Sequence, residues 1–263
     1  MKIASDSLEP TGLPCFQRET QAIAKYLKGL SYEKVKRLWA CNDKIATENY
    51  ERLKSAEPFE GVTPAILAYD GIAFTYMAPG IFQYGEFDYV QEHLRILSGF
   101  YGVLKPMDAV VPYRLEMQAK AKIEGSKNLY DFWGDKLYKE VIPKDYIIIN
   151  LASKEYSKTI EKYLSKEDIF ITCTFGELSS VKGVEKVIQK GVYAKMARGE
   201  MVKFMAENNV KAPEEIKAFN RLGYEFCKER SSDCHYVFLR ANWRKGDLWK
   251  WITNIKLKYP TLS

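Results

Sequence analysis

The sequence predicts an α/β protein, and three observations support this class. Apolar residues recur at helical spacing through residues 19–53, which predicts several amphipathic helices. The continuous apolar run at residues 146–151 has the composition of a buried central strand, and further β-rich runs occupy residues 169–175 and 184–189. We expect these three runs to pair in one sheet with helices against it.

The size and composition are those of a folded protein. The length of 263 residues and the 46% hydrophobic content allow a full core, as one large domain or as two small ones. The sequence has no run of about 18 apolar residues, and its N-terminus lacks the pattern of a signal peptide, so we expect a cytoplasmic protein without a membrane contact. The five cysteines are scattered and odd in number, which is typical of reduced thiols.

The charge balance leaves the kind of partner open. The chain has 40 Lys and Arg residues against 34 Asp and Glu, a net charge of +6 that fits a nucleic-acid partner and equally a basic enzyme. With two histidines and no Cys-x-x-Cys pair, we expect neither a metal site nor a cofactor.

The N-terminal region predicts three helices in succession. Residues 19–27, 32–40 and 45–53 each have helical periodicity, with polar or glycine-containing breaks between them. A further helix is expected to begin at residues 63–64, where a proline suits the first helical position. Residues 72–77 fit a strand or a helix equally well.

A capped helix followed by a double-glycine turn is the most distinctive element. Asp88 suits an N-cap with Gln91 three residues later, and the apolar periodicity of residues 90–97 continues the helix. Gly99 can end the helix in the left-handed conformation, and Gly102 permits a second tight turn. This outline fits a helix-hairpin-helix, whose backbone N–H groups can hold a nucleic-acid phosphate, or a helix end followed by an ordinary turn.

Three functional groups follow the turn within four residues. Tyr113, Arg114 and Glu116 supply a phenol, a guanidinium and a carboxylate. Arg can bind an anion through two hydrogen bonds, Glu can exchange protons or orient the Arg, and Tyr can stack or donate a hydrogen bond. The alternative interpretation is an Arg–Glu ion pair on the surface.

A second group of polar residues stands where the strand at 146–151 meets the following helix. Asn150 ends the strand, Ser153 suits the helix N-cap, and the helix carries Glu155, Tyr156 and Lys158. Backbone donors and polar side chains converge at such junctions, which makes them a common place for a site. Simple capping by Ser153 is the alternative.

Two cations lie on the last long helix that the sequence predicts, at about residues 193–208. Lys195 and Arg198 are three residues apart and share one face, where they can grip a phosphate or form a solvated surface. A hairpin with strands at residues 223–227 and 236–239 follows.

Five stretches taken together closely resemble the YaaA family of peroxide-stress-resistance proteins: LRILSGFYGVLKPMD, PYRLEM, DFWGD, NLASKEY and YAKMARG. They run collinearly within about Ser5 to Arg240. The resemblance implies a single α/β (α+β) body with a central mixed sheet flanked by helices, the family's cantaloupe fold, and a helix-hairpin-helix element. It also implies a cytoplasmic bacterial protein that binds double-stranded or distorted DNA in a positively charged cleft. Its role would be to protect DNA under hydrogen peroxide stress and to help keep intracellular iron low.

In that light, we expect DNA contacts from the glycine turn and from the polar groups that follow it. The expected DNA-binding residues are Ser98, Gly99, Tyr101, Gly102, Lys105, Arg114, Ser153, Lys158, Lys195 and Arg198. The alternative is a glycosylase-like enzyme that flips DNA bases into the same cleft. Tyr113 would stack on the base, Asn150 would read its edge, and Glu116 or Glu155 would activate water. We expect a monomer, and whether it is an enzyme stays open.

The chain departs from the family pattern at both ends. Family members begin with a strand followed by Ser-Pro-Ala-Lys, whereas here residues 1–3 pass directly to Ala-Ser-Asp. The family pattern ends near Arg240, so we divide the chain into a YaaA-like domain at residues 1–240 and a basic, Trp-rich extension at residues 241–263.

Overall fold

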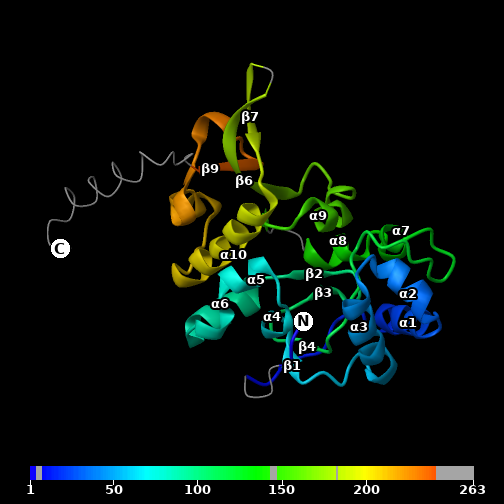
Figure 1. The fold of residues 1–263 in the computed structure, drawn as a ribbon. Helices are drawn as coiled ribbons and strands as arrows, with labels where there is room; N and C mark the ends of the chain where they lie inside the picture. The colour runs from blue at the N-terminus through cyan, green and yellow to red at the C-terminus, as the bar shows by residue number, and fades with distance from the viewer. Residues whose placement is uncertain (4–7, 143–146, 182, 241–263) are drawn as a thin grey trace.

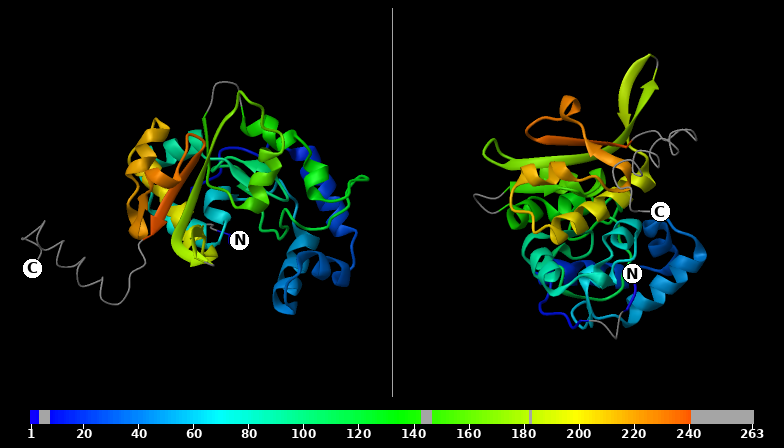
Figure 2. Two further views of the ribbon diagram at one scale, coloured as in Figure 1. Left: turned by 90° about the horizontal axis from the view of Figure 1, so that it is seen from above. Right: turned by 90° about the vertical axis from the view of Figure 1, so that its left-hand side faces the viewer.

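The fold is a mixed α/β body (Figure 1). The computed structural model describes residues 1–3, 8–142, 147–181 and 183–240, so the expected extension and the departure after residue 3 lie outside it. In the right-hand view of Figure 2, the main sheet lies at one end, a long helix lies beneath it, and the N-terminal helices lie farthest away.

The main sheet is mixed, as expected. Its strands follow the order β5 (Ile147–Asn150), β6 (Ile169–Val181), β9 (His235–Arg240) and β8 (Tyr224–Phe226). β5 and β9 run parallel to β6, whereas β8 runs antiparallel to β9. The distal half of β6 leaves this arrangement and pairs antiparallel with β7 (Val184–Ile188), forming a ribbon that projects from the body in Figure 1.

The prediction that residues 146–151 form a buried central strand is wrong. β5 pairs only with β6 among the described strands, and the side chain of Ile147 is 43% exposed. The central position belongs to β6, where Ile171, Cys173 and Phe175 are buried at the spacing of one sheet face. A short apolar run has the same sequence pattern in an edge strand with one neighbour as in a central strand with two. The sequence therefore does not indicate that β5 lies at an edge.

The three predicted N-terminal helices are confirmed as α1 (Gln17–Lys28), α2 (Tyr32–Trp39) and α3 (Asp43–Ser55). One face of α1 is buried at the periodicity that predicted it. Asn42 caps α3, because its side-chain oxygen accepts a hydrogen bond from the Ile45 N–H at 3.0 Å.

Residues 63–64 form strand β1 (Thr63–Pro64), which pairs with β4 (Ala109–Val110), and the expected helix begins one residue later as α4 (Ala65–Ala68). The undecided segment is a helix, α5 (Ile72–Met77). A 3₁₀ turn, η1 (Pro79–Ile81), leads from there to the next helix.

The helix expected from Asp88 to residue 97 begins and ends earlier, as α6 (Tyr84–His93). Its capping box is formed by Gln83 and Glu86, with the Gln83 N–H donating to Glu86 Oε2 at 2.7 Å. Gln91 instead accepts a hydrogen bond from the Met107 N–H at 3.0 Å. The N-cap of this helix, Gln83, therefore lies five residues before the predicted N-cap, Asp88.

The helix-hairpin-helix expectation does not match the structure around the double-glycine turn. The turn joins two antiparallel strands, β2 (Ile96–Ser98) and β3 (Gly102–Leu104). The backbone is already extended at Leu94, immediately after α6. The apolar spacing of residues 94–97 fits both a helix and a half-buried strand. These residues include strand β2 because its backbone pairs with β3.

Two short helices follow, α7 (Leu129–Trp133) and α8 (Lys136–Val141). Gly134 has a φ of +54° and interrupts them. Beyond β5 lies α9 (Lys154–Glu161), and α10 (Gly191–Glu207) is the long helix predicted to carry two cations.

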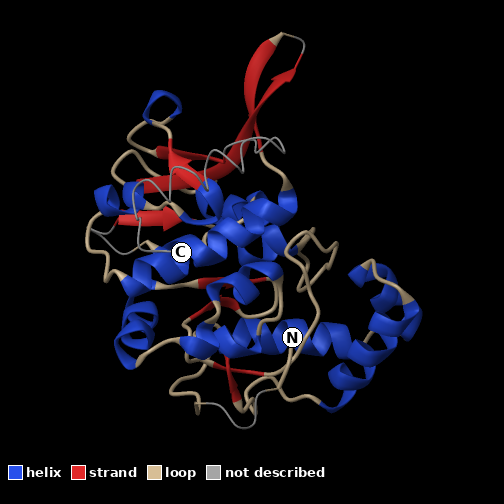
Figure 3. Ribbon diagram, turned by 60° about the vertical axis from the view of Figure 1, so that its left-hand side comes forward, coloured by secondary structure: helices blue, strands red, loops and turns tan. Residues whose placement is uncertain are grey.

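Three 3₁₀ turns complete the C-terminal part: η2 (Pro213–Ala218), η3 (Arg221–Gly223) and η4 (Lys228–Arg230). The predicted hairpin is confirmed by the antiparallel pairing of β8 and β9. Figure 3 shows the short strands of the two small sheets surrounded by helices. A single cluster of buried apolar residues runs from Ile23 on α1 through Trp133 to Phe238 on β9, so sheet and helices share one core.

Candidate functional site

The turn at residues 98–102 is organised by the Ser98 hydroxyl. Ser98 Oγ accepts hydrogen bonds from the N–H groups of Phe100, at 3.1 Å, and Tyr101, at 2.8 Å. This is the local side-chain-to-backbone pattern that lets serine stabilise a turn. Ser98 is fully buried, so its hydroxyl serves the fold and not the surface.

The two glycines allow close packing of this turn against its neighbours. A Cβ on Gly99 would lie 2.8 Å from the Leu115 carbonyl oxygen. Gly102 has a φ of +77°, and a Cβ there would lie 2.8 Å from the ring of Trp133. The Trp133 indole N–H also donates to the Gly99 carbonyl at 3.1 Å. Glycine is therefore required at both positions, because neighbouring groups cover the backbone and leave no room for a Cβ.

Tyr101 is equally internal. Its hydroxyl donates to the Pro58 carbonyl at 2.9 Å and accepts from the Val111 N–H at 3.1 Å. Because residues 98–102 are all buried, the predicted DNA contacts of Ser98, Gly99, Tyr101 and Gly102 do not fit this conformation. The sequence pattern of an exposed phosphate-binding turn is the same as that of a tightly packed β-hairpin turn, and only tertiary contacts distinguish the two.

Tyr113 joins this turn to a second tyrosine. Its hydroxyl lies 2.7 Å from Ser98 Oγ and 2.6 Å from the Tyr69 hydroxyl, and its ring stacks on Phe100 with centroids 4.9 Å apart. The face that was expected to stack on a base therefore already packs on Phe100. Burial raises the pKa of Tyr69 and raises that of Tyr113 well above its ordinary value, so both phenols are neutral at physiological pH.

A third phenol connects this pair to the predicted carboxylates. Burial is the largest cause that raises the pKa of Tyr156, followed by the nearby charge of Glu155 and then by Tyr69 and Glu116. Tyr156 is thus close enough to Tyr69, Glu116 and Glu155 for their charges to act on its phenol. We call Tyr69, Tyr113, Tyr156, Glu116 and Glu155 the phenol–carboxylate cluster.

The rim of this cluster is polar and more exposed. Arg114 Nη2 lies 3.4 Å from Glu116 Oε1, a long contact, while Gln118 donates its side-chain N–H to Glu116 Oε2 at 3.3 Å. Glu155 Oε1 accepts the Gln118 backbone N–H at 3.2 Å, which attaches the start of α9 to this segment. The structure therefore brings Tyr113, Arg114, Glu116 and Glu155 together, as the sequence interpretation required.

Asn150 is occupied by the sheet. Its side-chain N–H donates to Thr172 Oγ1 at 3.2 Å, and its oxygen accepts from the Ala152 N–H at 3.0 Å. The amide expected to read a base edge thus holds the end of β5 against β6. Ser153 occupies the N-cap position of α9, yet its side chain makes no capping hydrogen bond.

Lys158 on α9 lines a surface hollow of about 630 Å³ between α9 and α7. The hollow has mixed charge, and its lining residues are Lys127, Asn128, Tyr130, Asp131, Lys158, Thr159, Glu161, Lys162 and Tyr163. Within the described structure, Lys158 forms no hydrogen bond or ion pair with the phenol–carboxylate cluster, so these predicted residues do not form one site.

Arg198 on α10 has no anionic partner among the described residues. Its Nε is buried and has no hydrogen-bond partner, and burial lowers the pKa of the guanidinium. By contrast, Arg221 bonds Glu200 at 3.3 Å and also Glu207, and Arg240 bonds Glu177. Arg198 is therefore a cation taken partly out of water without compensation. Lys195, one turn earlier, is exposed.

Helix α5 contacts both α10, which carries Arg198, and the ring of Tyr69. Gly199 seats α10 on α5 so closely that an added Cβ would lie 2.0 Å from the Ala73 carbonyl oxygen. On its other side, Phe74 of α5 stacks on Tyr69 with centroids 4.9 Å apart. The two groups of predicted residues are thus joined through one short helix without a direct contact in the described structure.

The thiols that are clearly perturbed are poor nucleophiles. Burial, followed by Glu140 and Asp108, raises the pKa of Cys15 to about 11, and burial raises that of Cys173 to about 12. Peroxide reacts with thiolates, so these shifts do not favour a peroxide-reactive cysteine at either position. No group of three His, Cys, Asp or Glu side chains that could hold a metal ion occurs within the described residues.

Sequence reasoning named Tyr156 on the helix after Ser153 without giving it a role, and it missed Tyr69. Tyr156 stands in the NLASKEY stretch, where its family motif could have drawn attention to it. Tyr69 offered no local signal, because it reaches Tyr113 through an approach of segments 44 residues apart. Trp39 and its buried indole N–H were also missed, since nothing in a helical apolar pattern shows whether a donor finds an acceptor.

The fold and the site define a mixed α/β protein with a phenol–carboxylate cluster and, on α10, an arginine without a charge partner. A family model described as "Peroxide stress protein YaaA" matches residues 1–230. The chain therefore belongs to the peroxide stress protein YaaA family. No helix among the described residues has both the length and the apolar character needed to cross a membrane.

Similar bacterial proteins, each named UPF0246 protein, extend over almost the whole chain. One from Agathobacter rectalis is 55% identical over 240 residues, which cover 91% of this chain and 95% of the relative. One from Desulfitobacterium hafniense is 51% identical, covering 92% and 94%. One from Pediococcus pentosaceus is 48% identical, covering 93% and 96%.

Proposed function

We propose that this protein binds DNA through the phosphate backbone and protects it during hydrogen peroxide stress in the cytoplasm. The family description supports the stress role. The net charge of +6 is compatible with an anionic polymer. We propose a binding protein and not an enzyme that acts on bases. Such an enzyme would use the Tyr113 ring and the Asn150 amide, but here the ring stacks on Phe100 and the amide is hydrogen-bonded to Thr172.

One observation carries this proposal: the Nε of the Arg198 guanidinium is buried without a hydrogen-bond partner. Removing a cation from water is costly unless an anion compensates it, and no carboxylate of the described chain bonds Arg198. A phosphate from outside the chain would supply the missing charge. A desolvated cation without a charge partner is a candidate for a functional residue.

Neighbouring groups add to this cation. Lys195 is exposed one turn away on the same helix and would contact an adjacent phosphate. Further contacts are proposed for the remaining predicted residues with accessible side chains: Lys105, Arg114, Ser153 and Lys158. Such contacts position the backbone and carry no sequence information, so binding would be independent of sequence.

The same proposal makes any lowering of intracellular iron indirect. The described residues provide no group of three side chains suited to a metal ion. Binding that shields DNA from iron-dependent damage requires no iron ligand in this protein. Calorimetry that finds tight stoichiometric iron binding would contradict this part of the proposal.

The test is the salt dependence of binding to two unrelated duplexes. We expect equal affinities for both sequences and a steep loss of affinity with salt. The variants Arg198→Gln and Lys195→Glu should each weaken binding about tenfold, with Arg198→Gln lowering the log–log salt slope by about one. A flat salt dependence would refute the proposal.

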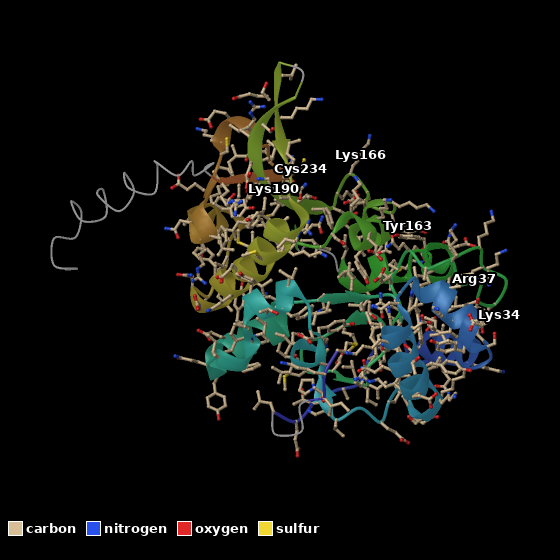
Figure 4. The ribbon with its side chains drawn as sticks, viewed as in Figure 1. Lys34, Arg37, Tyr163, Lys166, Lys190 and Cys234 are labelled. Carbon is tan, nitrogen blue, oxygen red and sulfur yellow. The ribbon has the colours of Figure 1, made fainter. Side chains whose placement is uncertain are left out.

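A matched control separates a local contact from a change in net charge. Lys34 is exposed on α2, far along the body from the start of α10, where Lys190 is labelled in Figure 4. Lys34→Glu changes the net charge as much as Lys195→Glu does. Equal losses from the two variants would mean that α10 is not the contact surface.

A further inference from the structure

A narrow pocket lies between the three N-terminal helices and the segment that carries Arg114. Its walls come from α1, α2 and α3, the hairpin turn and residues 111–114, and three lining side chains are aromatic: Trp39, Phe100 and Tyr113. Figure 1 shows these helices beside the short strands. The enclosed volume is about 20 Å³. That is room for about one water-sized group, which needs roughly 10–15 Å³.

Two of the residues that line this pocket each have a buried N–H donor without an acceptor. Trp39 is 5% exposed, and its indole Nε1 is buried without a hydrogen-bond partner. The Nε of Arg114 is buried without a partner as well. Buried donors in native proteins are almost always satisfied, and two such donors on one pocket indicate an acceptor that comes from outside the chain.

The charge around the pocket selects the kind of acceptor. Its described lining includes Lys28 and Arg114 but no acidic side chain. Lys28 is already engaged by Glu57 at 2.7 Å, whereas the contact of Arg114 with Glu116 is long, at 3.4 Å. The guanidinium is therefore the cation with bonding capacity to spare. An anionic oxygen would satisfy it better than a neutral one.

We propose that this pocket receives one oxygen of a terminal phosphate, with Trp39 Nε1 and Arg114 Nε as its donors. The limited volume admits a single oxygen, so the remainder of the group would lie at the mouth. A phosphate within a DNA strand carries a sugar on both sides, whereas a phosphate monoester carries one, so a terminal phosphate meets less steric obstruction at the mouth. For a DNA end as the source, this inference rests on the proposed function; free phosphate is the other source of the same chemistry.

The direct test follows the indole N–H resonances of the protein by ¹⁵N NMR during titration with inorganic phosphate. The Trp39 resonance, assigned with Trp39→Phe, should shift and saturate. Trp133 is an internal control, because its indole N–H already donates to the Gly99 carbonyl at 3.1 Å. A Trp39 resonance that does not respond, or that responds equally to chloride, overturns the proposal, since water would then be sufficient as the acceptor.

The Arg114→Gln variant tests the second donor without altering the buried tryptophan. It should remove the Trp39 shift and weaken phosphate binding about tenfold, the effect expected for a lost charge-assisted hydrogen bond. An unchanged shift in this variant contradicts the proposal. If Trp39→Phe does not fold, Arg114→Gln retains the test, because the Arg114 side chain is 29% exposed at the rim.

The source of the phosphate is resolved with duplexes that differ only at their ends. Duplexes with 5′-phosphate, 3′-phosphate or hydroxyl ends are compared with a closed dumbbell that has no ends. A phosphate-ended duplex should shift Trp39 and bind about tenfold more tightly than its hydroxyl counterpart. A shift with inorganic phosphate alone assigns the pocket to free phosphate. Binding of every duplex without any Trp39 shift refutes the pocket while leaving the proposed DNA binding intact.

Discussion

The hydroxyl of Tyr113 lies 2.7 Å from Ser98 Oγ, and this contact joins the glycine turn to the segment carrying the predicted site. The same Ser98 oxygen accepts two backbone N–H groups of the turn. One buried hydroxyl therefore determines both the shape of the turn and the place of the tyrosine. The residues expected to touch DNA at this turn instead support the residues behind it.

Ser98→Ala should destabilise the fold by about 2–4 kcal/mol, because two buried N–H groups and the Tyr113 hydroxyl lose a partner. Urea unfolding measures this loss. Ser153→Ala is the matched control, since Ser153 makes no side-chain capping hydrogen bond, and it should change stability by less than about 0.5 kcal/mol. Equal effects of the two substitutions would contradict the role of Ser98.

Gly102→Ala should cost more than Gly183→Ala, although both glycines have a φ of +77°. Each substitution incurs the strain of a left-handed alanine, about 1–2 kcal/mol. At Gly102 the new methyl group also meets the Phe16 and Trp133 rings at 2.8 Å, whereas at Gly183 it meets nothing within 4 Å. We expect an additional loss of about 1–3 kcal/mol at Gly102. Thermal unfolding of both variants gives the difference, and equal losses would contradict the close packing.

The helical part of the fold was well predicted from sequence, because α1, α2, α3 and α10 are long enough for apolar periodicity to define them. The mixed sheet was also anticipated. The short elements were not, since β2 and β3 contain three residues each and are strands only through their mutual pairing. Sequence patterns record local spacing, and these elements depend on contacts between segments.

The candidate site was predicted only in part for the same reason. Tyr113, Arg114 and Glu116 are close together in the sequence, so they were predicted to share a site. The structure brings Glu155 from α9 to the same segment. The sequence could not show that the Asn150 side chain is hydrogen-bonded to Thr172, or that Arg198 has no counter-charge among the described residues. Whether a polar group is satisfied is a property of its surroundings in the fold.

Stability should fall as the pH rises above about 10, because the pKa of Tyr113 is raised well above 10 in the folded protein. The unfolded chain then loses the phenol proton first, so the unfolded state gains stability at high pH. Each such phenol contributes a slope of up to about 1.4 kcal/mol per pH unit. Urea unfolding between pH 8 and 11 should show a shallower loss for Tyr113→Phe, while Tyr84→Phe, at an 86% exposed position, should not differ from the parent. A parent whose stability is constant over this range would refute the argument.

Glu177 should contribute stability that is lost in acid. Burial raises the pKa of this carboxyl, but its hydrogen bonds to Lys190 and Arg240 outweigh burial and leave the pKa below its usual value. The contribution is therefore fully present above about pH 4.5 and is lost as the pH falls below it. Glu177→Gln should cost about 2–4 kcal/mol at pH 7 and flatten the acid side of the stability profile, since two cations lose their partner. An acid profile that is unchanged in the variant would contradict this account.

Arg198→Met separates a binding arginine from a structural one. A structural arginine stabilises the fold through its partners, but Arg198 has a buried Nε without a partner and a guanidinium that burial desolvates. Replacing it with an apolar side chain of similar length should leave stability unchanged or raise it by about 1 kcal/mol. The same variant should bind DNA about tenfold more weakly at moderate salt, because one phosphate contact is lost. Arg221→Met is the comparison: it breaks the bonds to Glu200 and Glu207 and should destabilise the fold. A loss of stability in Arg198→Met as large as that in Arg221→Met would show that Arg198 supports the structure and does not await an anion.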